Sequence, residues 1–347
     1  MRAWVIRGTG GVEHLELAEV PDPGPVRARE VRVALRAAAL NHLDLFVLQG
    51  LPHEYRFPHV VGADGAGVVD AVGPEVQTVR PGDHVMINPG IPDYTCDYCR
   101  AGEHSLCRNY GILGEHLPGT IAPYVVVPEQ NLAIIPTLPT SLRWAEAAAF
   151  SLVTLTAWRM VVTRAQLAAG ETVLIWGIGG GVALAALRIA KLKGARVIVT
   201  SSSDAKLAEA RRHGADATLN HRTQKVSQEV RALTEQRGAN VVIDDVGEAT
   251  WDESLRSLGR GGRLVTCGAT AGPKVGLDLR RVFWYQWSIL GSTMGNAAEY
   301  EAIVRLLATG ELRPIVDRVF PFNEARGAFE RLARGEQLGK IVVEIAP

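Results

Sequence analysis

Apolar and polar positions follow two different patterns along this chain, and the pattern changes near residue 140. Before that point, short apolar runs such as 31–40, 65–72 and 82–87 are separated by glycine and proline turns. Such runs between such turns are typical of β-strands. The first part of the chain is therefore predicted to be a β-rich domain.

From Leu142 onward, predicted helices and strands alternate. Apolar residues recur at helical spacing through 141–162, where Ser141 could cap the helix. The strand runs that follow are 172–176, 196–200, 241–246, 262–268 and 288–292, and the first two are each followed by an amphipathic helix, at 182–194 and 205–214. This alternation predicts an α/β domain with a parallel sheet and helices on both faces.

The last part of the chain is predicted to return to the β-rich domain. A helix at 298–310 leads into 316–347, which carries a turn, a helix and a closing strand. The predicted division is therefore a β-rich domain at 1–140, completed by 298–347, and a parallel-sheet domain at 141–297.

Composition narrows the classes of partner. The chain has 347 residues, with 37 basic and 37 acidic side chains. This balance gives no electrostatic reason to expect nucleic acid or an anionic membrane as a partner. The start does not read as a signal peptide, and the longest apolar stretch, Ala147–Trp158, is shorter than the roughly 20 residues that cross a membrane. We expect a cytoplasmic protein that acts on a small molecule.

A glycine loop follows the first strand of the parallel sheet. Residues 172–176 run into Gly177, Gly180, Gly181 and Val182 before the next helix. Backbone amides at a helix N-terminus bind a pyrophosphate well. Val182 breaks the usual G-x-G-x-x-G pattern, so we read the spacing as Gly177-x-x-Gly180-x-x-Ala183. The loop predicts a nicotinamide cofactor, and an ordinary βα turn is the alternative.

The end of the second strand predicts which nicotinamide cofactor binds. NAD enzymes usually carry an acidic residue there, which binds the ribose hydroxyls. This chain instead has Ser201 and Ser202, with Lys206 soon after. Small hydroxyls and a cation favour the 2′-phosphate of NADP(H), and NAD(H) remains the alternative. Asp204 lies too late and reads as the N-cap of the next helix, while Lys206 could simply be a solvated helix residue.

Three of the four cysteines cluster with an aspartate. Asp93, Cys96, Cys99 and Cys107 are spaced 3, 3 and 8 residues apart. Three thiolates and a carboxylate can close a tetrahedral zinc site with no open position. We predict one structural zinc per chain; the alternative is a loop of reduced cysteines without metal. His104 is a substitute ligand at the wrong spacing.

These motifs together resemble the medium-chain dehydrogenase/reductase family, which includes zinc-type alcohol dehydrogenases and quinone oxidoreductases. The resemblance covers essentially the whole chain. It implies a GroES-like catalytic domain, a Rossmann cofactor domain and a tail that returns to the catalytic domain. It also implies a homodimer or homotetramer.

The resemblance also implies where a catalytic zinc would bind, and all three positions have changed. The first is a Cys-x-x-Asp motif, which matches residues 41–44, with Asn41 in place of the cysteine. The second is a Gly-His-Glu motif, which matches Gly62-Ala63-Asp64. The third is a cysteine or an acidic residue, which would fall at 150–152. We therefore expect no catalytic zinc. Zinc-free relatives reduce a quinone or an α,β-unsaturated carbonyl with NADPH, and hydrogen-bond donors hold the resulting charge.

Few residues are candidates for this chemistry. Asn41 could donate to a substrate oxygen or merely bond the loop backbone, and Asp44 more often braces such a loop than transfers a proton. Tyr55 and His53 are candidate proton donors, although both could be ordinary surface-loop residues.

Further cofactor contacts follow from the resemblance. His42 would face the pyrophosphate, His221 the adenosine and Lys340 the cleft. The remaining contacts fall at strand ends and are Val246, Gly247, Gly268, Ala269, Ser292 and Thr293.

Two other functions stay open. An alcohol or aldehyde dehydrogenase would need a metal or a base that the motifs do not supply. A weakly catalytic, cofactor-binding sensor or structural protein would keep the glycine loop and lose the catalytic ligands.

Overall fold

The computed structural model describes residues 1–135 and 142–345, and the chain divides into two compact units. The first comprises Met1–Val153 and Gly295–Pro347, and the second comprises Thr154–Met294. The predicted cap Ser141 lies outside the described residues. Among the described residues, no helix has the length and apolar character needed to span a membrane.

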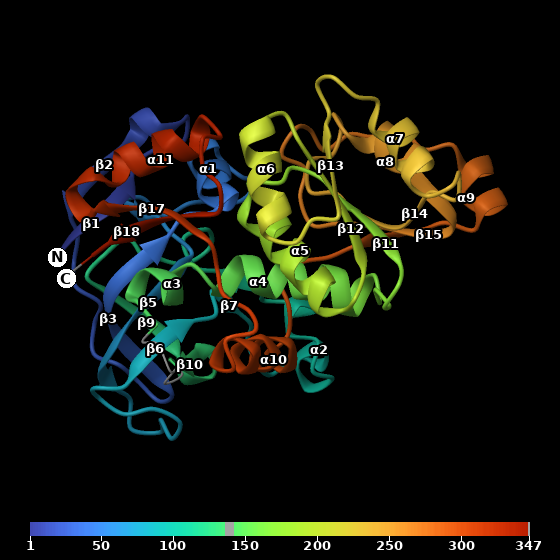
Figure 1. The fold of residues 1–347 in the computed structure, drawn as a ribbon. Helices are drawn as coiled ribbons and strands as arrows, with labels where there is room; N and C mark the ends of the chain where they lie inside the picture. Colours follow the sequence, from blue (N-terminus) through green and yellow to red (C-terminus); the bar gives the residue numbers. More distant parts are fainter. Residues whose placement is uncertain (136–141, 346–347) are drawn as a thin grey trace. The chain divides into compact units, whose positions relative to one another are not determined.

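The first unit is built on a seven-stranded sheet (Figure 1). Its main path is β10 (Leu132–Ile134), β6 (His84–Ile87), β5 (Asp64–Val72), β3 (Glu30–Ala39), β18 (Lys340–Glu344) and β17 (Val316–Pro321), and β9 (Tyr124–Pro128) also pairs with β3. Alternate residues of β3 are buried, because one face of a half-buried strand faces the core. Val31, Val33 and Leu35 are among these core residues.

Smaller elements complete this unit. Two further sheets join β2 (Leu15–Glu19), β1 (Arg2–Ile6) and β4 (His59–Val60), and β7 (Gly90–Ile91) with β8 (Gly111–Ile112). The helices are α1 (His42–Gln49), α2 (Asp97–Arg100), α3 (Trp144–Ala148), α10 (Ala297–Ala308) and α11 (Ala325–Ala333). Phe329 of α11 packs in a core with Trp4 of β1, so the end of the chain and its beginning share one hydrophobic core.

The second unit is a six-stranded, all-parallel sheet. Its order is β13 (Ala217–Asn220), β12 (Arg196–Ser201), β11 (Thr172–Ile175), β14 (Ala239–Ile243), β15 (Leu258–Thr266) and β16 (Ser288–Gly291). Numbered along the chain this is 3-2-1-4-5-6, the order of a Rossmann domain. The expected combination of a GroES-like domain and a Rossmann domain is confirmed.

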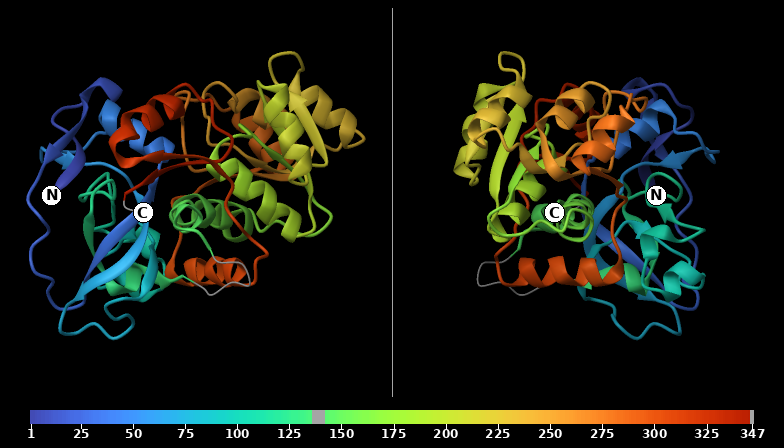
Figure 2. Two further views of the ribbon diagram at one scale, coloured as in Figure 1. Left: turned by 60° about the vertical axis from the view of Figure 1, so that its left-hand side comes forward. Right: turned by 90° about the vertical axis from the view of Figure 1, so that its right-hand side faces the viewer.

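Helices cover both faces of the parallel sheet, as expected for strands that are buried on both sides. Figures 1 and 2 show α5 (Gly181–Leu192) and α6 (Asp204–Arg212) on one face, and α7 (Val226–Leu233), α8 (Trp251–Ser257) and α9 (Leu279–Tyr285) on the other. β11 and β14 adjoin at the centre, where chain order reverses, which is where such sheets bind ligands.

Three local predictions are wrong. The expected helix at 141–162 is divided into α3, α4 (Ser151–Trp158) and a π-helical segment, Arg159–Arg164. Residues 151–157 are all buried, so they lack the one-sided pattern that marks a helix. The expected turn after 316 is strand β17. The N-cap of α6 is Ser203, whose hydroxyl accepts a hydrogen bond from the Lys206 N–H, rather than Asp204.

Candidate active site and metal centre

Three buried side chains of the first unit form a connected cluster, which we call the lysine cluster: Asn41, Asp64 and Lys340. The Lys340 ammonium donates to Asp64 Oδ2 at 2.9 Å and also to Asn41 Oδ1. The Asn41 amide donates to the same Asp64 oxygen at 3.1 Å. Asp64 is fully buried, and Lys340 is 3% exposed. The three groups therefore satisfy one another away from water.

Strand register explains why these residues meet although they are far apart in the sequence. In the antiparallel pairing of β3 with β5, Ala39 lies opposite Asp64, and in the pairing of β3 with β18 it lies opposite Val342. Two residues farther along, Asn41 therefore comes level with Lys340. The adjacent strands β5, β3 and β18 thus bring together residues from three distant segments of the chain.

The backbone at the start of α4 completes the environment of Asp64. The Leu152 N–H donates to Asp64 Oδ1 at 2.9 Å. Thr120 Oγ1 donates to the Asp64 carbonyl at 2.8 Å. Both carboxylate oxygens therefore accept hydrogen bonds within the unit, and Asp64 is an organising residue that the sequence analysis left out of the site.

Asp44 braces the segment that carries Asn41. Its carboxylate accepts the Asn41 backbone N–H at 2.6 Å, an arrangement that satisfies one donor at the start of α1. Burial raises the pKa of Asp44 from its ordinary value to about 7, opposed by this backbone hydrogen bond and by Lys340.

The donor chemistry of the lysine cluster differs from that of a zinc site. Zinc takes lone pairs from thiolate, imidazole or carboxylate. Here Asn41 Oδ1 and Asp64 Oδ2 both accept from the Lys340 ammonium. The oxygens at the two matched motifs are therefore already occupied by the Lys340 ammonium in this structure.

Tyr55 and His53 belong to a different group of side chains. The Tyr55 ring lies 4.3 Å from the His53 ring and 5.4 Å from the His59 ring, measured between centroids. The Tyr55 hydroxyl accepts the Leu51 N–H at 3.3 Å, and burial raises its pKa. The described contacts of Tyr55 therefore do not join it to Asn41 or Asp44.

The predicted zinc ligands come together in the loops around α2, which we call the metal lobe: Asp93, Cys96, Cys99 and Cys107. Their candidate ligand atoms all lie within 4.8 Å of one another. The Cys96 and Cys99 sulfurs are 3.6 Å apart, and the Cys99 sulfur is 3.4 Å from Asp93 Oδ1. Sulfurs about 2.3 Å from a tetrahedral zinc are about 3.8 Å apart. The residues therefore fit a structural zinc.

Hydrogen bonds hold the Asp93 carboxylate in place. Oδ1 accepts the N–H groups of Thr95 at 2.8 Å and Cys96 at 3.0 Å, and Oδ2 accepts from Asn109 at 2.8 Å. These donors, the Thr95 N–H first, lower the pKa of Asp93 well below its usual range. His104 instead accepts the Ala297 N–H through Nδ1 and is not one of the grouped ligands.

The glycine loop of the second unit lies between β11 and α5, as the cofactor prediction requires. Gly177 and Gly179 have φ values of 67° and 129°, which glycine adopts readily. A Cβ on Gly179 would lie 2.9 Å from Lys206 Cδ and 3.2 Å from its Nζ. Gly180 is the N-cap of α5, and Gly181 and Val182 begin the helix. The Lys206 side chain therefore lies across the loop.

Residues at the end of β12 lie beside this loop. Ser201 is buried, and its hydroxyl accepts the Ser203 N–H. Ser202 follows it and is partly exposed. The His221 ring lies 6.0 Å from the Trp176 ring. The residues predicted to bind the adenosine part of the cofactor, Ser201, Ser202 and His221, therefore lie near the glycine loop. Trp176 is an additional neighbour that was not predicted from the sequence.

A buried aspartate shapes the next loop at the same edge of the sheet. Asp244 Oδ1 accepts the N–H groups of Val246 and Gly247 at 2.9 and 3.1 Å, and Oδ2 accepts the Ser254 hydroxyl at 2.6 Å. Asp244 was not identified from the sequence, although it ends a strand run. The remaining predicted contacts follow β15 and β16 at their carboxyl ends: Gly268, Ala269, Ser292 and Thr293.

His42 and Lys340 belong to the first unit, whereas the other predicted cofactor contacts belong to the second. His42 is exposed on the first turn of α1. Lys340 is already engaged by Asn41 and Asp64.

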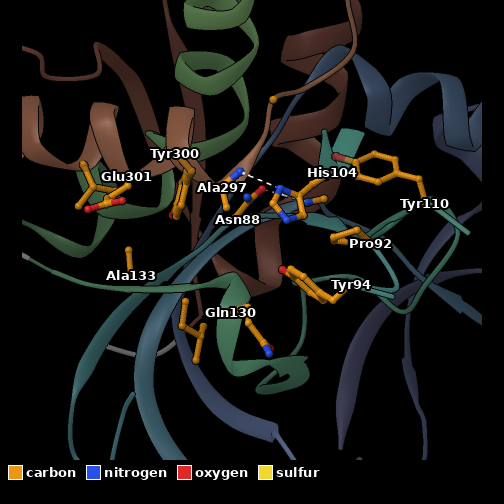
Figure 3. Close-up of a pocket in the computed structure, with 14 residues that line it drawn as sticks. Asn88, Pro92, Tyr94, His104, Tyr110, Gln130, Ala133, Ala297, Tyr300 and Glu301 are labelled. Atoms are coloured by element: carbon orange, nitrogen blue, oxygen red, sulfur yellow. Dashed lines mark hydrogen bonds between the residues drawn. The ribbon is translucent and has the colours of Figure 1, made fainter. Parts of the chain in front are cut away.

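A pocket of about 280 Å³ opens within the first unit (Figure 3). Figure 3 shows Tyr94 and His104 of the lobe loops facing Tyr300 and Ala297 of α10. The Tyr300 hydroxyl lies 3.0 Å from that of Ser151, which adjoins the segment bound to Asp64. None of the predicted catalytic or cofactor residues lines this pocket.

Comparisons with known proteins agree with this geometry. Residues 27–137 match the alcohol dehydrogenase GroES-like domain, and residues 181–309 match the zinc-binding dehydrogenase domain. The chain is 33% identical to an acryloyl-coenzyme A reductase of Metallosphaera sedula, covering 99% of both chains, and 31% identical to a quinone oxidoreductase of Pseudomonas aeruginosa, covering 96% of both.

A solved structure titled as an NAD-dependent alcohol dehydrogenase is 46% identical, covers 100% of both chains and superposes with a TM-score of 0.94. Full-length similarity at this level, on a GroES-like unit and a Rossmann unit, shows the family. The chain belongs to the medium-chain dehydrogenase/reductase superfamily, the oxidoreductases that include zinc-type alcohol dehydrogenases and quinone oxidoreductases.

Proposed function

We propose that this enzyme transfers hydride from a nicotinamide cofactor to a quinone or an α,β-unsaturated carbonyl without a catalytic metal. One observation carries the proposal: the Lys340 ammonium is hydrogen-bonded to both Asn41 and Asp64, which lie within the two motifs that supply zinc ligands in zinc-type relatives. The acryloyl-coenzyme A reductase relative supports it, because acryloyl thioesters are α,β-unsaturated carbonyl compounds.

NADP(H), when bound, supplies the hydride that the acceptor carbon receives. In this proposal the Lys340 ammonium stabilises the developing oxyanion electrostatically. Asp64 holds the ammonium in place, and Asn41 links the two. Asp44 keeps the Asn41 segment fixed, and Tyr55 remains a candidate proton donor.

We further propose that the cofactor is NADP(H) rather than NAD(H). Support comes from the absence of an acidic residue at 200–203, at the end of β12, and from the Lys206 ammonium beside the glycine loop. Ser201→Asp would place a carboxylate next to the 2′-phosphate. It should shift the ratio of kcat/KM for NADPH over NADH at least tenfold toward NADH, about 1.4 kcal/mol. Strong preference of the wild-type enzyme for NADH would contradict this part.

Reduction of a panel of acceptors tests the main proposal. NADPH-loaded enzyme is mixed with quinones, enals, enoyl thioesters and saturated aldehydes, and loss of cofactor absorbance is followed by stopped flow. Conjugated acceptors should react at least a hundredfold faster than saturated aldehydes. Zinc-dependent oxidation of simple alcohols would instead support the alcohol dehydrogenase alternative, which the 46% identical structure favours. Cofactor binding without any turnover would support a sensor.

We also propose that the enzyme is a cytoplasmic homodimer or homotetramer with one structural zinc per chain. The metal lobe needs reduced cysteines, which a reducing compartment preserves.

Helix α9 supports the proposed assembly. It carries the exposed aromatic side chains Phe283 and Trp284, at 68% and 66% exposure, and neighbouring exposed apolar side chains are a feature of contact surfaces. Light scattering of the purified protein measures the assembly.

A further inference from the structure

A second group of metal-binding side chains lies in the first unit, which we call the histidine cluster: His53, Glu115 and His116. His53 lies in the loop after α1, and the other two lie in the turn after β8. One candidate ligand atom from each residue lies within 4.8 Å of the other two. None of these residues belongs to the lysine cluster or to the metal lobe.

The distances within the histidine cluster suit a bridging ion better than direct contact. His53 Nε2 lies 3.9 Å from Glu115 Oε1, and His116 Nδ1 lies 3.7 Å from the same oxygen. Both separations are too long for hydrogen bonds. Ligand atoms of a tetrahedral zinc with bonds of about 2.0–2.1 Å are about 3.3 Å apart. Contractions of about 0.4–0.6 Å would bring these two pairs to that spacing.

The His53 ring is oriented with a lone pair toward the cluster. Its Nδ1 faces the Glu54 carbonyl at 3.4 Å. A carbonyl only accepts, so in the neutral tautomer that donates to it the lone pair is on Nε2. Nε2 is buried and has no hydrogen-bond partner among the described residues. Metal-binding histidines usually donate their other N–H to a carbonyl or carboxylate in this way.

The chemistry of the other two residues also suits a cation. His116 offers a second imidazole, a ligand type that zinc accepts. The Glu115 side chain is only 13% exposed, and a buried carboxylate is costly unless a cation pairs with it. An ion would replace the 3.3 Å hydrogen bond from the Ile112 N–H to His116 Nδ1.

The two segments are already fixed relative to each other. His59, six residues after His53, contacts the Gly114 carbonyl through Nε2 at 3.0 Å. The turn that carries Glu115 and His116 is closed by hydrogen bonds to the Ile112 carbonyl. The ligands are therefore preorganised, which lowers the cost of binding.

We propose that His53, Glu115 and His116 bind a divalent transition-metal ion of the Zn²⁺ type. Two imidazoles and one carboxylate suit zinc, cobalt or ferrous iron and leave at least one position open for water or another ligand. The ion would fasten the loop after α1 to the turn after β8. This site is independent of the proposed function, which requires only that no metal binds at Asn41 and Asp64.

Metal titration of the full-length enzyme tests this site. Apo protein is titrated with Co²⁺, with the bound ion counted by elemental analysis. The metal lobe should give thiolate-to-cobalt charge-transfer bands, whereas the histidine cluster should give only ligand-field bands. Wild type should bind two equivalents. His53→Gln and Glu115→Gln should each lose the second equivalent and keep the charge-transfer bands, with unchanged circular dichroism.

Matched variants locate the ion. His14→Gln changes a histidine that is 45% exposed on the surface and should keep both equivalents. Cys99→Ser should lose the charge-transfer bands and keep the ion at the histidine cluster. Saturation at one equivalent in wild type would overturn the proposal, as would two equivalents in both cluster variants. A second ion lost only on Asp64→Asn would overturn this site and the proposed metal-free chemistry together.

Discussion

The metal lobe and the lysine cluster lie in the same unit and hold charge in opposite ways. In the metal lobe, backbone N–H groups keep Asp93 anionic beside three cysteines. In the lysine cluster, a buried ammonium is paired with a buried carboxylate. One arrangement presents lone pairs and attracts a cation, whereas the other already contains its cation. In the proposed mechanism, metal binding and catalysis therefore have separate locations in this enzyme.

Loss of a thiolate from the metal lobe should have the largest effect. Cys99→Ser should abolish zinc binding there, a site whose zinc affinity can be worth on the order of 10 kcal/mol. Elemental analysis and thermal unfolding measure the result, and a chelator should lower the wild-type Tm in the same way. Cys267, outside the lobe, provides the control through Cys267→Ser. Unchanged zinc content in Cys99→Ser would contradict the ligand assignment.

Removal of the ammonium should break the lysine cluster. Lys340→Met leaves Asp64 buried without its cation, which should lower the free energy of unfolding by about 3–5 kcal/mol. Lys340→Met combined with Asp64→Asn should recover part of this loss. The control Lys191→Met removes a pair whose side chains are 35% and 36% exposed, and it should cost at most about 1 kcal/mol. Urea unfolding measures all three, and equal losses for both lysines would contradict the account.

Asp44, which braces the segment that carries Asn41, should make the stability of the protein depend on pH. The pKa of Asp44 is raised to about 7, so the folded protein holds this proton more tightly than the unfolded chain. The tighter binding of this proton contributes fully to stability below about pH 4. The contribution is lost as the pH rises toward 7, which lowers the free energy of unfolding by up to about 4 kcal/mol. Asp44→Asn cannot titrate, so wild type should lose stability relative to this variant over that range. A constant difference from pH 4 to 8 would refute the raised pKa.

The smallest expected effect concerns the residue that orients a ligand. Asn109 donates to Asp93 Oδ2 at 2.8 Å. Asn109→Ala should weaken zinc binding about tenfold, because partners of ligands typically contribute 10–100-fold to affinity. Competition with a chromophoric chelator measures the affinity. The control Asn240→Ala alters a side chain of the second unit and should leave the zinc affinity unchanged. If Asn109→Ala lost as much zinc affinity as Cys99→Ser, Asn109 would do more than orient Asp93.

Local patterns carried most of the fold prediction. Apolar runs identified five of the six strands of the parallel sheet, because strands buried on both faces are continuously apolar. The edge strand β13 was missed, since only one of its four residues is buried. Short spacing between Asp93, Cys96, Cys99 and Cys107 identified the metal lobe, since its ligands are neighbours in the chain. Strand β17 was missed because Asp317 and Arg318 interrupt its apolar run, and none of its residues is buried.

The lysine cluster could not be predicted in full, because its geometry depends on strand register. Lys340 and Asn41 are 299 residues apart in the sequence. They meet only because β18 and β5 both pair with β3 in a particular alignment. The motif comparison located Asn41 and Asp64 as changed positions, but only the pairing of strands shows that an ammonium lies between them. The histidine cluster was missed because His53 lies far in the sequence from Glu115 and His116, and these loop residues meet only in the folded chain.

Anomalous diffraction at the zinc edge, from crystals grown with zinc and NADPH, tests the central claim most directly. The account predicts a peak enclosed by Asp93, Cys96, Cys99 and Cys107, and continuous density for the Lys340 ammonium between Asn41 and Asp64. Any second peak should lie at the histidine cluster. A zinc peak coordinated by Asn41 and Asp64, with Lys340 displaced, would contradict the proposed metal-free hydride transfer.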